Sequence, residues 1–420
     1  MQTSTLDYRK VRQEKIIKAL GNKDTSVQFD DSLENAMVLN MGPQHPATHG
    51  VLRLLLKLDG ETVIQCIPEL GYLHRGYEKL AENCSYHEYI PHTDRLDYLS
   101  PLLNNTAYVL AVEKLLGIEA PRRTQFIRTI ISELARISSH CLAMGALAMD
   151  IGALTVFLWT FREREKLYDI FENLTGARFT TSYTRIGGVA QDLTPEVKKM
   201  MEDFINQFPE KLFECEKLLN TNRIFVERMD GVGVITREKA ISLGMTGPNL
   251  RAVGIEHDIR RVEPYLLYNE FDFEVPTFEG GDCLARYYVR LNEMKQSILI
   301  LQQALEKIPQ GPIHAFDTKK VLPRKERIYT KMEEMIHDFM LINIGAVPPI
   351  GEVYHAVEGS KGELGFYIQS RGEGQPWRLK IRSPSFCNLQ SLPTLIHNSM
   401  LSDVVAIIGS IDPVMGEADK

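Results

Sequence analysis

The pattern of apolar and polar positions changes twice along the chain. Between Ala36 and Pro68 two apolar runs, VLRLLLKL and ETVIQCI, flank Asp59-Gly60, a dipeptide typical of a tight turn between strands. From Gly76 to about Gly176 the apolar residues recur at helical spacing. Between Gly351 and Ile381 strand-like segments return, separated by glycine turns. We therefore expect an α+β fold, mainly α, in which a helical core is flanked by N- and C-terminal β elements.

Local signals mark where several helices begin. Pro121 precedes an apolar-periodic run, and Thr194-Pro195 is typical of an N-cap followed by a first-turn proline. Further helices are predicted from Arg286 to Lys307 and from Arg324 to Met340. We divide the chain into an N-terminal extension (1–35), a β unit (36–75), a helical core (76–345) and a C-terminal β/α region (346–420). Residues 1–33 are polar and amphipathic, and we expect them to form a helix on another subunit.

One stretch imitates a membrane span. Cys141 to Phe161 contains a single charged residue, Asp150. A span with an aspartate in mid-bilayer would be costly and would need a function. One such segment in a chain of mean hydropathy −0.17 is weak evidence for spanning. We expect two buried helices that meet near Gly152, which makes Asp150 a buried carboxylate in need of a partner.

Composition excludes some classes of protein. The chain has 420 residues, 44% hydrophobic and 25% charged, which is ordinary for a globular protein. Its net charge of −7 argues against nucleic acid as the main partner. The six cysteines are scattered without a C-x-x-C pair, which fits reduced thiols in a cytosol-facing protein. The N-terminal segment has no apolar stretch typical of a signal peptide.

Residues Met41 to Gly50, MGPQHPATHG, form the first candidate site. They place two histidines, His45 and His49, four residues apart with Pro46 between them. Pro46 disfavours a helical residue at His45, so both imidazoles are expected on a loop or a strand end. Since imidazoles titrate near neutral pH, such a loop can exchange protons or hold a metal.

Two further motifs imitate known sites. His87 to His92 imitates a zinc-protease motif, but its histidines are five apart and Pro91 interrupts a helix, which favours a surface loop. Gly231 to Thr236 imitates a dinucleotide-binding loop but lacks the third glycine and a surrounding βαβ unit. A plain turn is the better prediction there.

Two polar stretches need more context. His74 and Arg75 precede a glycine and a helix-like run, which places a cationic pair at a helix entrance. A solvated surface arginine is the alternative. Tyr98 lies between charged residues just before an apolar helix, and taken alone it would be read as part of a helix cap.

Five motifs occur in this chain in the same order as in a known family. The motifs are HPATHG, GYLHRGYEK, TDRLDYLSP, ARFTTSYTRIGG and KGELGFY…KIRSPSF…SDVVAIIGSIDPVMGE. From about Ala36 to the last residue the chain resembles the quinone-site (49 kDa or D-type) subunit of respiratory complex I. That family is related to the large subunits of nickel-iron hydrogenases, so the resemblance implies their fold.

The hydrogenase comparison concerns four positions. Those enzymes hold their metal through R-x-C-x-x-C and D-P-C-x-x-C motifs. Arg95 to Ser100 aligns with the first motif, with Asp97 and Ser100 at its two cysteine positions. Asp412 to Glu417 aligns with the second motif, with Val414 and Glu417 at its two cysteine positions. Because soft thiolate ligands are missing, we expect no nickel, iron or zinc, and a former metal cavity closed by region 346–420.

The resemblance implies one subunit of a proton-translocating NADH-quinone oxidoreductase whose vacated cavity holds a quinone headgroup. Reduced quinone is basic at both oxygens and needs two proton donors. The positions that match the family's headgroup ligands are Tyr98 and His49, and Asp150 matches the partner of that histidine. An Asp–His pair favours the imidazolium. Quinol formation would leave charge on this pair, as a first event in proton pumping.

Arg75 and Arg95 match arginines near the terminal iron-sulfur cluster of the family.

The same resemblance implies the cofactors and partners. The chain itself would bind no cofactor: quinone is its substrate, and NAD, FMN and the iron-sulfur clusters lie in partner subunits. The expected partners are a small subunit with the terminal 4Fe-4S cluster, a C-type (30 kDa-like) hydrophilic subunit and a membrane subunit that forms the quinone channel. The chain would be peripheral, on the cytoplasmic side of the bacterial inner membrane. Thr180 stands where mitochondrial members carry a histidine, which puts redox-linked proton uptake there in doubt.

Two alternatives remain open at this stage. One is a non-catalytic scaffold subunit, which the presence of Tyr98, His49 and Asp150 disfavours. The other is the equivalent subunit of a related complex fed by ferredoxin or another donor. The sequence fits ubiquinone and menaquinone equally.

Overall fold

Helices occupy the middle of the chain, and small antiparallel sheets lie before and after them. The computed structural model describes residues 36–316 and 320–420, and Val38–Lys420 forms one compact unit. The β elements are β1 (Met37–Met41), β2 (Arg53–Asp59), β3 (Thr62–Glu69), β4 (Thr184–Arg185), β5 (Gly188–Val189), β6 (Gly351–Glu358), β7 (Glu363–Ser370) and β8 (Arg378–Arg382). The helices up to residue 227 are η1 (Pro46–Thr48), α2 (Tyr77–Ala81), α3 (Ile90–Thr93), α4 (Pro101–Leu116), α5 (Arg122–Asp150), α6 (Leu154–Thr175), α7 (Pro195–Asn220) and α8 (Arg223–Glu227). The later helices are α9 (Arg237–Ser242), α10 (Pro248–Arg251), α11 (Ile259–Val262), η2 (Tyr268–Glu270), α12 (Cys283–Lys307), α13 (Lys325–Ile328), α14 (Met332–Asn343), α15 (Pro384–Leu389), α16 (Leu392–Ile396), α17 (Leu401–Ile411) and α18 (Met415–Ala418). The prediction of a mainly α, α+β fold is confirmed.

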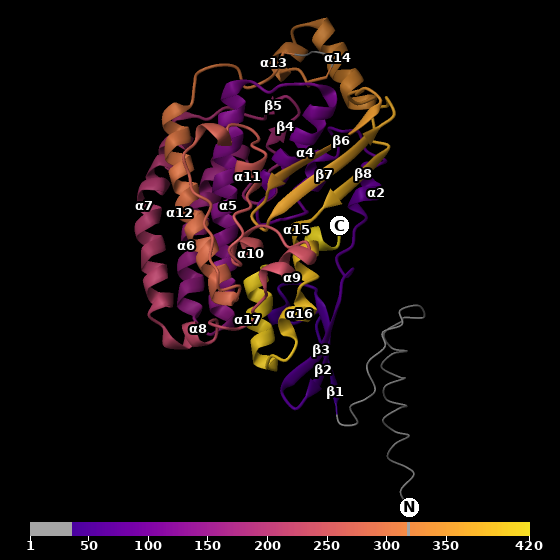
Figure 1. Ribbon diagram of the computed structural model, residues 1–420. Coiled ribbons are helices and arrows are strands. Elements are labelled where there is room, and N and C mark those ends of the chain that lie inside the picture. The colour runs from indigo at the N-terminus through magenta and orange to yellow at the C-terminus, as the bar shows by residue number, and fades with distance from the viewer. Residues whose placement is uncertain (1–35, 317–319) are drawn as a thin grey trace, which may run out of the picture. The chain divides into compact units, whose positions relative to one another are not determined.

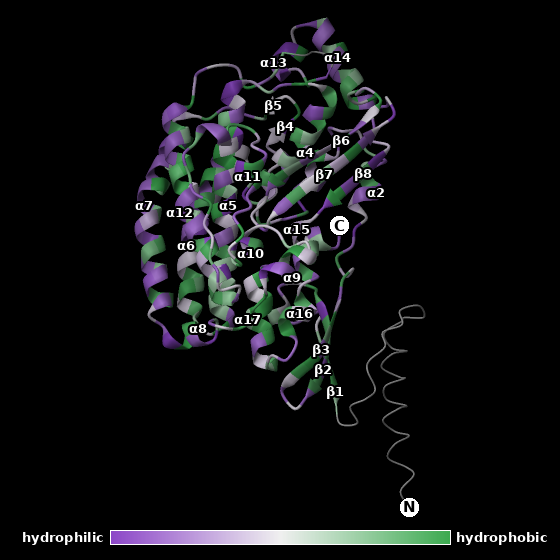
Figure 2. Ribbon diagram, viewed as in Figure 1, coloured by the Kyte–Doolittle hydropathy of each residue, from purple (hydrophilic) through white to green (hydrophobic). Residues whose placement is uncertain are grey.

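Four long helices, α5, α6, α7 and α12, pack side by side as a bundle (Figure 1). Helix α5 begins directly after Pro121, as predicted. Helix α7 is capped by Thr194, whose hydroxyl accepts a hydrogen bond from the N–H of Val197 at 3.2 Å. Helix α12 begins three residues before the predicted start and is capped by Asp282. Figure 2 shows polar residues along the outer side of α7, which leaves its apolar side for the bundle.

The two three-stranded sheets lie on either side of the helices in sequence. Strands β2 and β3 pair antiparallel, from Arg53 opposite Glu69 to Asp59 opposite Thr62, so the hairpin predicted at Asp59-Gly60 is confirmed. In the second sheet β7 lies between β6 and β8. Helix α4 packs on β6 and β7 and also on α5, so it forms a layer between sheet and bundle (Figure 1).

The turn between β6 and β7 is buried. Most turns lie on the surface, because their backbone groups need water. Here Ser360 is 0% exposed and Lys361 is 1% exposed. The guanidinium of Arg136 donates to the carbonyls of Glu358 (2.7 Å) and Gly359 (2.9 Å), which supplies partners from α5 in place of water.

The apolar stretch Cys141 to Phe161 forms the end of α5 and the start of α6, which meet around Gly152 as predicted. Only part of it is buried, because Met149, Leu154 and Leu158 are exposed. Among the residues that the structure describes, no helix is long and apolar enough to cross a membrane.

Two local predictions were wrong. The helix expected from Arg324 to Met340 is interrupted between α13 and α14. At this point the Thr330 hydroxyl donates to the carbonyl of Glu326 at 2.8 Å, a side-chain bond that competes with helix continuation.

The second error concerns His87 to His92. Pro91 lies in the first turn of α3, where proline is tolerated, so it helps to begin a helix. The segment is not a surface loop, because Tyr86, Tyr89 and Ile90 are buried and draw the chain inward. The turn predicted at Gly231 to Thr236 is confirmed. The helix expected within residues 1–33 lies outside the described residues.

Candidate functional site

The structure places His49 and Asp150 together. His45 precedes the short helix η1 in an extended conformation, and His49 follows it with a left-handed backbone (φ 49°). Both histidines of the first motif therefore lie outside a helix, as predicted. Its ring Nε2 lies 2.8 Å from Oδ2 of Asp150, the last residue of α5. The two side chains are 15% and 9% exposed. The buried carboxylate therefore has an imidazole as its partner.

The pair leaves one ring nitrogen available. Nε2 of His49 is engaged by Asp150, and Nδ1 has no hydrogen-bond partner within residues 36–316 and 320–420. With Asp150 ionised, Nε2 carries the proton of this contact. Nδ1 can then donate a hydrogen bond only when the ring is the imidazolium. The arrangement is suited to deliver a proton from Nδ1 to an acceptor and to hold the ring in place through Nε2.

Tyr98 lies in the turn that precedes α4. Its ring packs against Phe179, with 6.4 Å between centroids. Its hydroxyl has no hydrogen-bond partner in the described part of the chain, which leaves it available to a ligand. Burial raises the pKa of Tyr98, and the charges of Asp97, Asp412 and Glu417 raise it further. Tyr98 therefore keeps its proton at neutral pH and can act as a donor.

Two glycines allow one segment to approach both candidate donors. A Cβ atom on Gly409 in α17 would lie 3.4 Å from Nε2 of His49 and 3.5 Å from Oδ2 of Asp150. A Cβ atom on Gly416 in α18 would lie 3.3 Å from Cδ1 of Tyr98. The His49–Asp150 pair and the Tyr98 ring thus both pack against residues 409–416.

The four positions of the missing thiolates also gather here. Asp97 and Glu417 are 2% and 1% exposed. Asp97 accepts from the hydroxyl of Ser100, and Glu417 accepts from both the N–H (3.0 Å) and the hydroxyl of Ser385. Burial, then the charge of Asp97, raises the pKa of Glu417 to about 8. In the ranges that the structure describes, no three His, Cys, Asp or Glu side chains are grouped so as to hold a metal ion.

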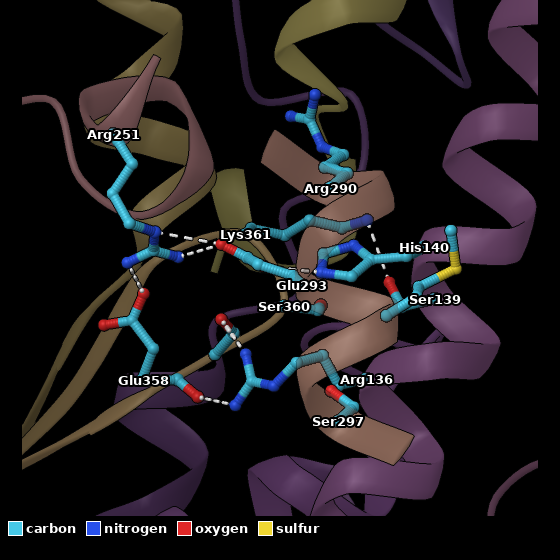
Figure 3. Close-up of polar contacts among 12 residues, drawn as sticks. Arg136, Ser139, His140, Arg251, Arg290, Glu293, Ser297, Glu358, Ser360 and Lys361 are labelled. Carbon is cyan, nitrogen blue, oxygen red and sulfur yellow. Dashed lines mark hydrogen bonds and ion pairs between the residues drawn. The ribbon is translucent and has the colours of Figure 1, made fainter. Parts of the chain in front are cut away.

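A lysine that the motifs did not single out lies beside these carboxyl groups. Lys361, at the buried tip of the β6–β7 hairpin, forms an ion pair with Asp412. It also donates to the hydroxyl of Ser139 at 3.0 Å (Figure 3). The hydroxyl of the adjacent Ser360 donates to Oδ2 of Asp97 at 2.9 Å. Lys361 begins the motif KGELGFY, but no periodic signal marks a lysine that a turn carries into the interior.

A chain of buried charges connects this tip to the bundle (Figure 3). Glu293 on α12 accepts from Nε of Arg251 at 2.9 Å and contacts Nε2 of His140 at 2.8 Å. Arg251 also donates to Glu358, at 2.8 Å. Arg290, one turn before Glu293, donates to the carbonyl of Ser410 at 2.6 Å and so fixes the end of α17.

The two predicted arginines lie on the surface. Arg75 is exposed, just before α2. The loop that carries it is anchored by Asp419, whose carboxylate accepts from the N–H of Gly71 at 2.9 Å and whose carbonyl contacts Nδ1 of His74 at 2.5 Å. Arg95 has a side chain that is 43% exposed, and it donates to the carbonyl of Pro91 at 2.5 Å.

Phe179 is a site residue that sequence reasoning missed. It is 42% exposed and packs between Tyr98 and Tyr168, 6.5 Å from the Tyr168 ring centroid. Thr180 follows it and is half-buried. The motif ARFTTSYTRIGG pointed to this segment, but the contact with Tyr98 joins residues 81 positions apart and leaves no local pattern.

Comparison with known proteins gives a consistent result. The family model described as the 49 kDa subunit of respiratory-chain NADH dehydrogenase matches residues 150–420. The chain is 62% identical over 416 residues to a D-type subunit of the NADH-quinone oxidoreductase of Chloroherpeton thalassium, and the match covers 99% of this chain and 94% of the relative. It is 58% identical over 391 residues to the D-type subunit of Salinibacter ruber, with coverage of 93% and 87%. It is 51% identical over 420 residues to the D-type subunit of Akkermansia muciniphila, with full coverage of both chains.

Proposed function

The chain belongs to the 49 kDa subunit family of respiratory-chain NADH dehydrogenase, a part of the multisubunit NADH-quinone oxidoreductase, and on that premise we propose that Tyr98 and His49 bind and protonate the quinone headgroup. The observation that carries the proposal is the packing of the Tyr98 ring and the His49–Asp150 pair against one short segment, residues 409–416. Both candidate donors have a proton-bearing atom without a partner in the described part of the chain.

The chemistry needs two protons and two electrons. Quinone takes up both electrons, and each of its two oxygens then accepts one proton. The Tyr98 hydroxyl would give one proton and Nδ1 of His49 the other. After the second transfer His49 is neutral, and the charge of Asp150 loses its cationic partner. That change in charge, at the end of α5, is the event that we propose to link quinone reduction to proton translocation.

The electrons would come from a partner subunit. We propose that a small subunit holds the terminal 4Fe-4S cluster close to Arg75 and Arg95, and that NAD, FMN and the remaining clusters lie in other partners. The exposure of both guanidinium groups supports this. A cation near the cluster would raise its reduction potential. A C-type hydrophilic subunit and a membrane subunit with the quinone channel complete the proposed contacts, on the cytoplasmic side of the bacterial inner membrane.

The test is Tyr98→Phe in the assembled complex. This change removes one hydroxyl with almost no change in volume. A hydrogen bond to a developing anion contributes roughly 1.5–3 kcal/mol, so NADH:quinone reductase activity should fall about ten- to a hundredfold. NADH oxidation with the hydrophilic acceptor ferricyanide should persist. Tyr329→Phe, at a ring that is 85% exposed, is the matched control and should leave both activities unchanged.

Variants of the second donor separate the two roles of the pair. His49→Ala should also impair quinone reduction, because it deletes a donor. Asp150→Asn should act more mildly, because it weakens the contact but keeps the ring. Unchanged quinone reduction in Tyr98→Phe would show that the headgroup assignment is wrong and would favour a scaffold role for the protein.

A further inference from the structure

The β6–β7 hairpin carries a charged residue into the interior of the protein. Lys361 lies at the tip of this hairpin and is 1% exposed. The tip is held tightly: Asn388 donates to the carbonyl of Lys361 at 3.1 Å, and the loop passes so close to Gly247 that a Cβ there would lie 2.8 Å from the same carbonyl. Since removing an ammonium group from water costs several kcal/mol unless the group is paired, a lysine at this place needs compensating partners.

The ammonium group of Lys361 has two contact partners, and its charge influences a third group. Its ammonium group pairs with Asp412, which follows α17. It also donates to Ser139 on α5 (Figure 3). Its charge also lowers the pKa of Glu417 in α18, against the larger opposing effects of burial and of Asp97. The neighbouring Ser360 hydroxyl donates to Asp97. The hairpin tip therefore contacts or influences every carboxyl group of this cluster.

The same carboxyl groups act on Tyr98. Asp97 directly precedes Tyr98 in the chain, and Glu417 follows Gly416, whose Cβ would lie 3.3 Å from the Tyr98 ring. After burial, Asp97, Asp412 and Glu417 raise the pKa of Tyr98, although Glu417, with a pKa of about 8, is itself largely protonated at neutral pH. When Tyr98 gives its proton to the quinone, it becomes an anion close to the carboxylates of Asp97 and Asp412. Lys361 is the cation paired within this group, so it offsets part of their effect on the phenolate.

We infer that Lys361 is a positioning residue for quinone reduction, which balances the carboxylate charge behind Tyr98 and so determines how readily Tyr98 gives up its proton. This inference rests on the proposed function of Tyr98. Lys361 acts through Asp412 and the carboxyl cluster, and it does not contact the quinone.

The test compares three variants of the assembled complex by their NADH:decylubiquinone and NADH:ferricyanide activities. Lys361→Met keeps the length of the side chain but removes its charge, and quinone reduction should fall at least roughly tenfold, or ~1.4 kcal/mol. Lys361→Arg keeps the charge and should retain most of the activity. The double variant Lys361→Met/Asp412→Asn removes one positive and one negative charge, and it should recover activity relative to Lys361→Met. Ferricyanide reduction should be normal in all three.

Arg123→Met is the matched control for loss of a buried cation. Arg123 lies on the same helix as Ser139, is 8% exposed, and pairs with Asp192 at 2.7 Å. Sixteen residues of helix separate the two positions, about 24 Å. Quinone reduction should be unaffected, because the lost charge is remote from Ser139 and so from the ammonium group of Lys361, which Ser139 contacts.

Measuring Tyr98→Phe in the same series distinguishes a failure of the inference about Lys361 from a failure of the proposed function of Tyr98. Normal activity in Lys361→Met, combined with a loss in Tyr98→Phe, overturns the inference and leaves the proposed function standing. No loss in Tyr98→Phe overturns both. A loss in Lys361→Met that neither Lys361→Arg nor the double variant relieves shows a merely structural role. If Lys361→Met does not assemble, the charge-balanced double variant decides: activity close to that of the unaltered complex supports the inference, and a tenfold loss overturns it.

Discussion

The absence of a Cβ atom at Gly416 lets α18 pack closely against the turn that carries Tyr98. At Gly416 a Cβ would lie 2.5 Å from the carbonyl oxygen of Leu96 and 2.7 Å from that of Arg95, and both are backbone atoms that cannot turn aside. We expect Gly416→Ala to separate α18 from the turn that carries Tyr98. Overpacking of this kind costs about 1–3 kcal/mol, so the urea midpoint should fall and quinone reduction with it. Gly351→Ala, where a Cβ would meet nothing within 4 Å, is the control.

His87 makes a separate prediction about pH. Burial, then the charge of Arg185, lowers the pKa of His87 to about 4. Between about 6.5 and 4 the unfolded chain binds a proton that the folded chain does not, so stability should fall as pH falls through this window, by at most ~1.4 kcal/mol per pH unit. His87→Leu should remove this part of the pH dependence when urea midpoints are compared at pH 7.5 and 5. The same change at the exposed His397 should leave it in place, and an unaltered slope in His87→Leu would contradict the assignment.

At the scale of elements, Glu133 joins three helices. It lies on α5 and is 0% exposed, contacts Arg260 of α11 at 3.2 Å, and accepts from Ser297 of α12 at 2.6 Å. Glu133→Gln keeps the volume but leaves the guanidinium group of Arg136 without its carboxylate partner, whereas Arg260 keeps Asp258 at 2.7 Å. Breaking a buried pair typically costs 3–5 kcal/mol, so we expect a loss of about that size in the free energy of unfolding, measured by urea titration.

The control for this prediction is a pair on the surface. Arg223 and Glu227 lie 2.7 Å apart on α8, with side chains 87% and 62% exposed. Water screens such pairs, so Glu227→Gln should change stability by less than about 1 kcal/mol. Equal losses in the two variants would mean that the buried network does not hold the bundle together.

Elements whose ends are decided locally were predictable. The Thr194 hydroxyl caps α7 within three residues, and the Asp59-Gly60 turn joins strands that are adjacent in sequence. The break between α13 and α14 at Thr330 could not be predicted, because the helical spacing of apolar residues continues across it. The Thr330 hydroxyl bonds the carbonyl of Glu326 and competes there with the backbone hydrogen bonds of a helix. The segment around His87 was misread because proline serves both to interrupt a helix and to begin one.

The candidate site was predictable only through the family resemblance. His49 and Asp150 are 101 residues apart, and no periodicity links a loop histidine to the end of a distant helix. Apolar patterning alone indicates that Asp150 needs a partner but does not say which residue that is. The burial of Lys361 could not be predicted from the sequence. It depends on Arg136 and Asn388, which supply hydrogen bonds to a turn that would otherwise lie in water.

For the molecule as a whole, we predict attachment to the membrane through partner subunits. The chain is a part of the multisubunit NADH-quinone oxidoreductase, so other subunits can supply the attachment. Treatment of membranes with a mild chaotrope should release the chain together with its hydrophilic neighbours, as followed by immunoblotting of the wash and the pellet. Retention of the chain alone in washed membranes would contradict this prediction.

The contacts that close the site also imply an order of events in folding. Ser100 and Ser360 are 260 residues apart, and His74 and Asp419 are 345 apart, whereas each long helix forms from neighbours. Closing such long loops costs entropy before any contact repays it, so non-local pairings form slowly. We expect the amides of α5 and α12 to gain protection from hydrogen exchange before those of residues 409–416. A newly made chain would thus pass through a state with a formed bundle in which residues 409–416 do not yet pack against Tyr98 and His49. The proposed quinone site would form only after the last and longest loops had closed.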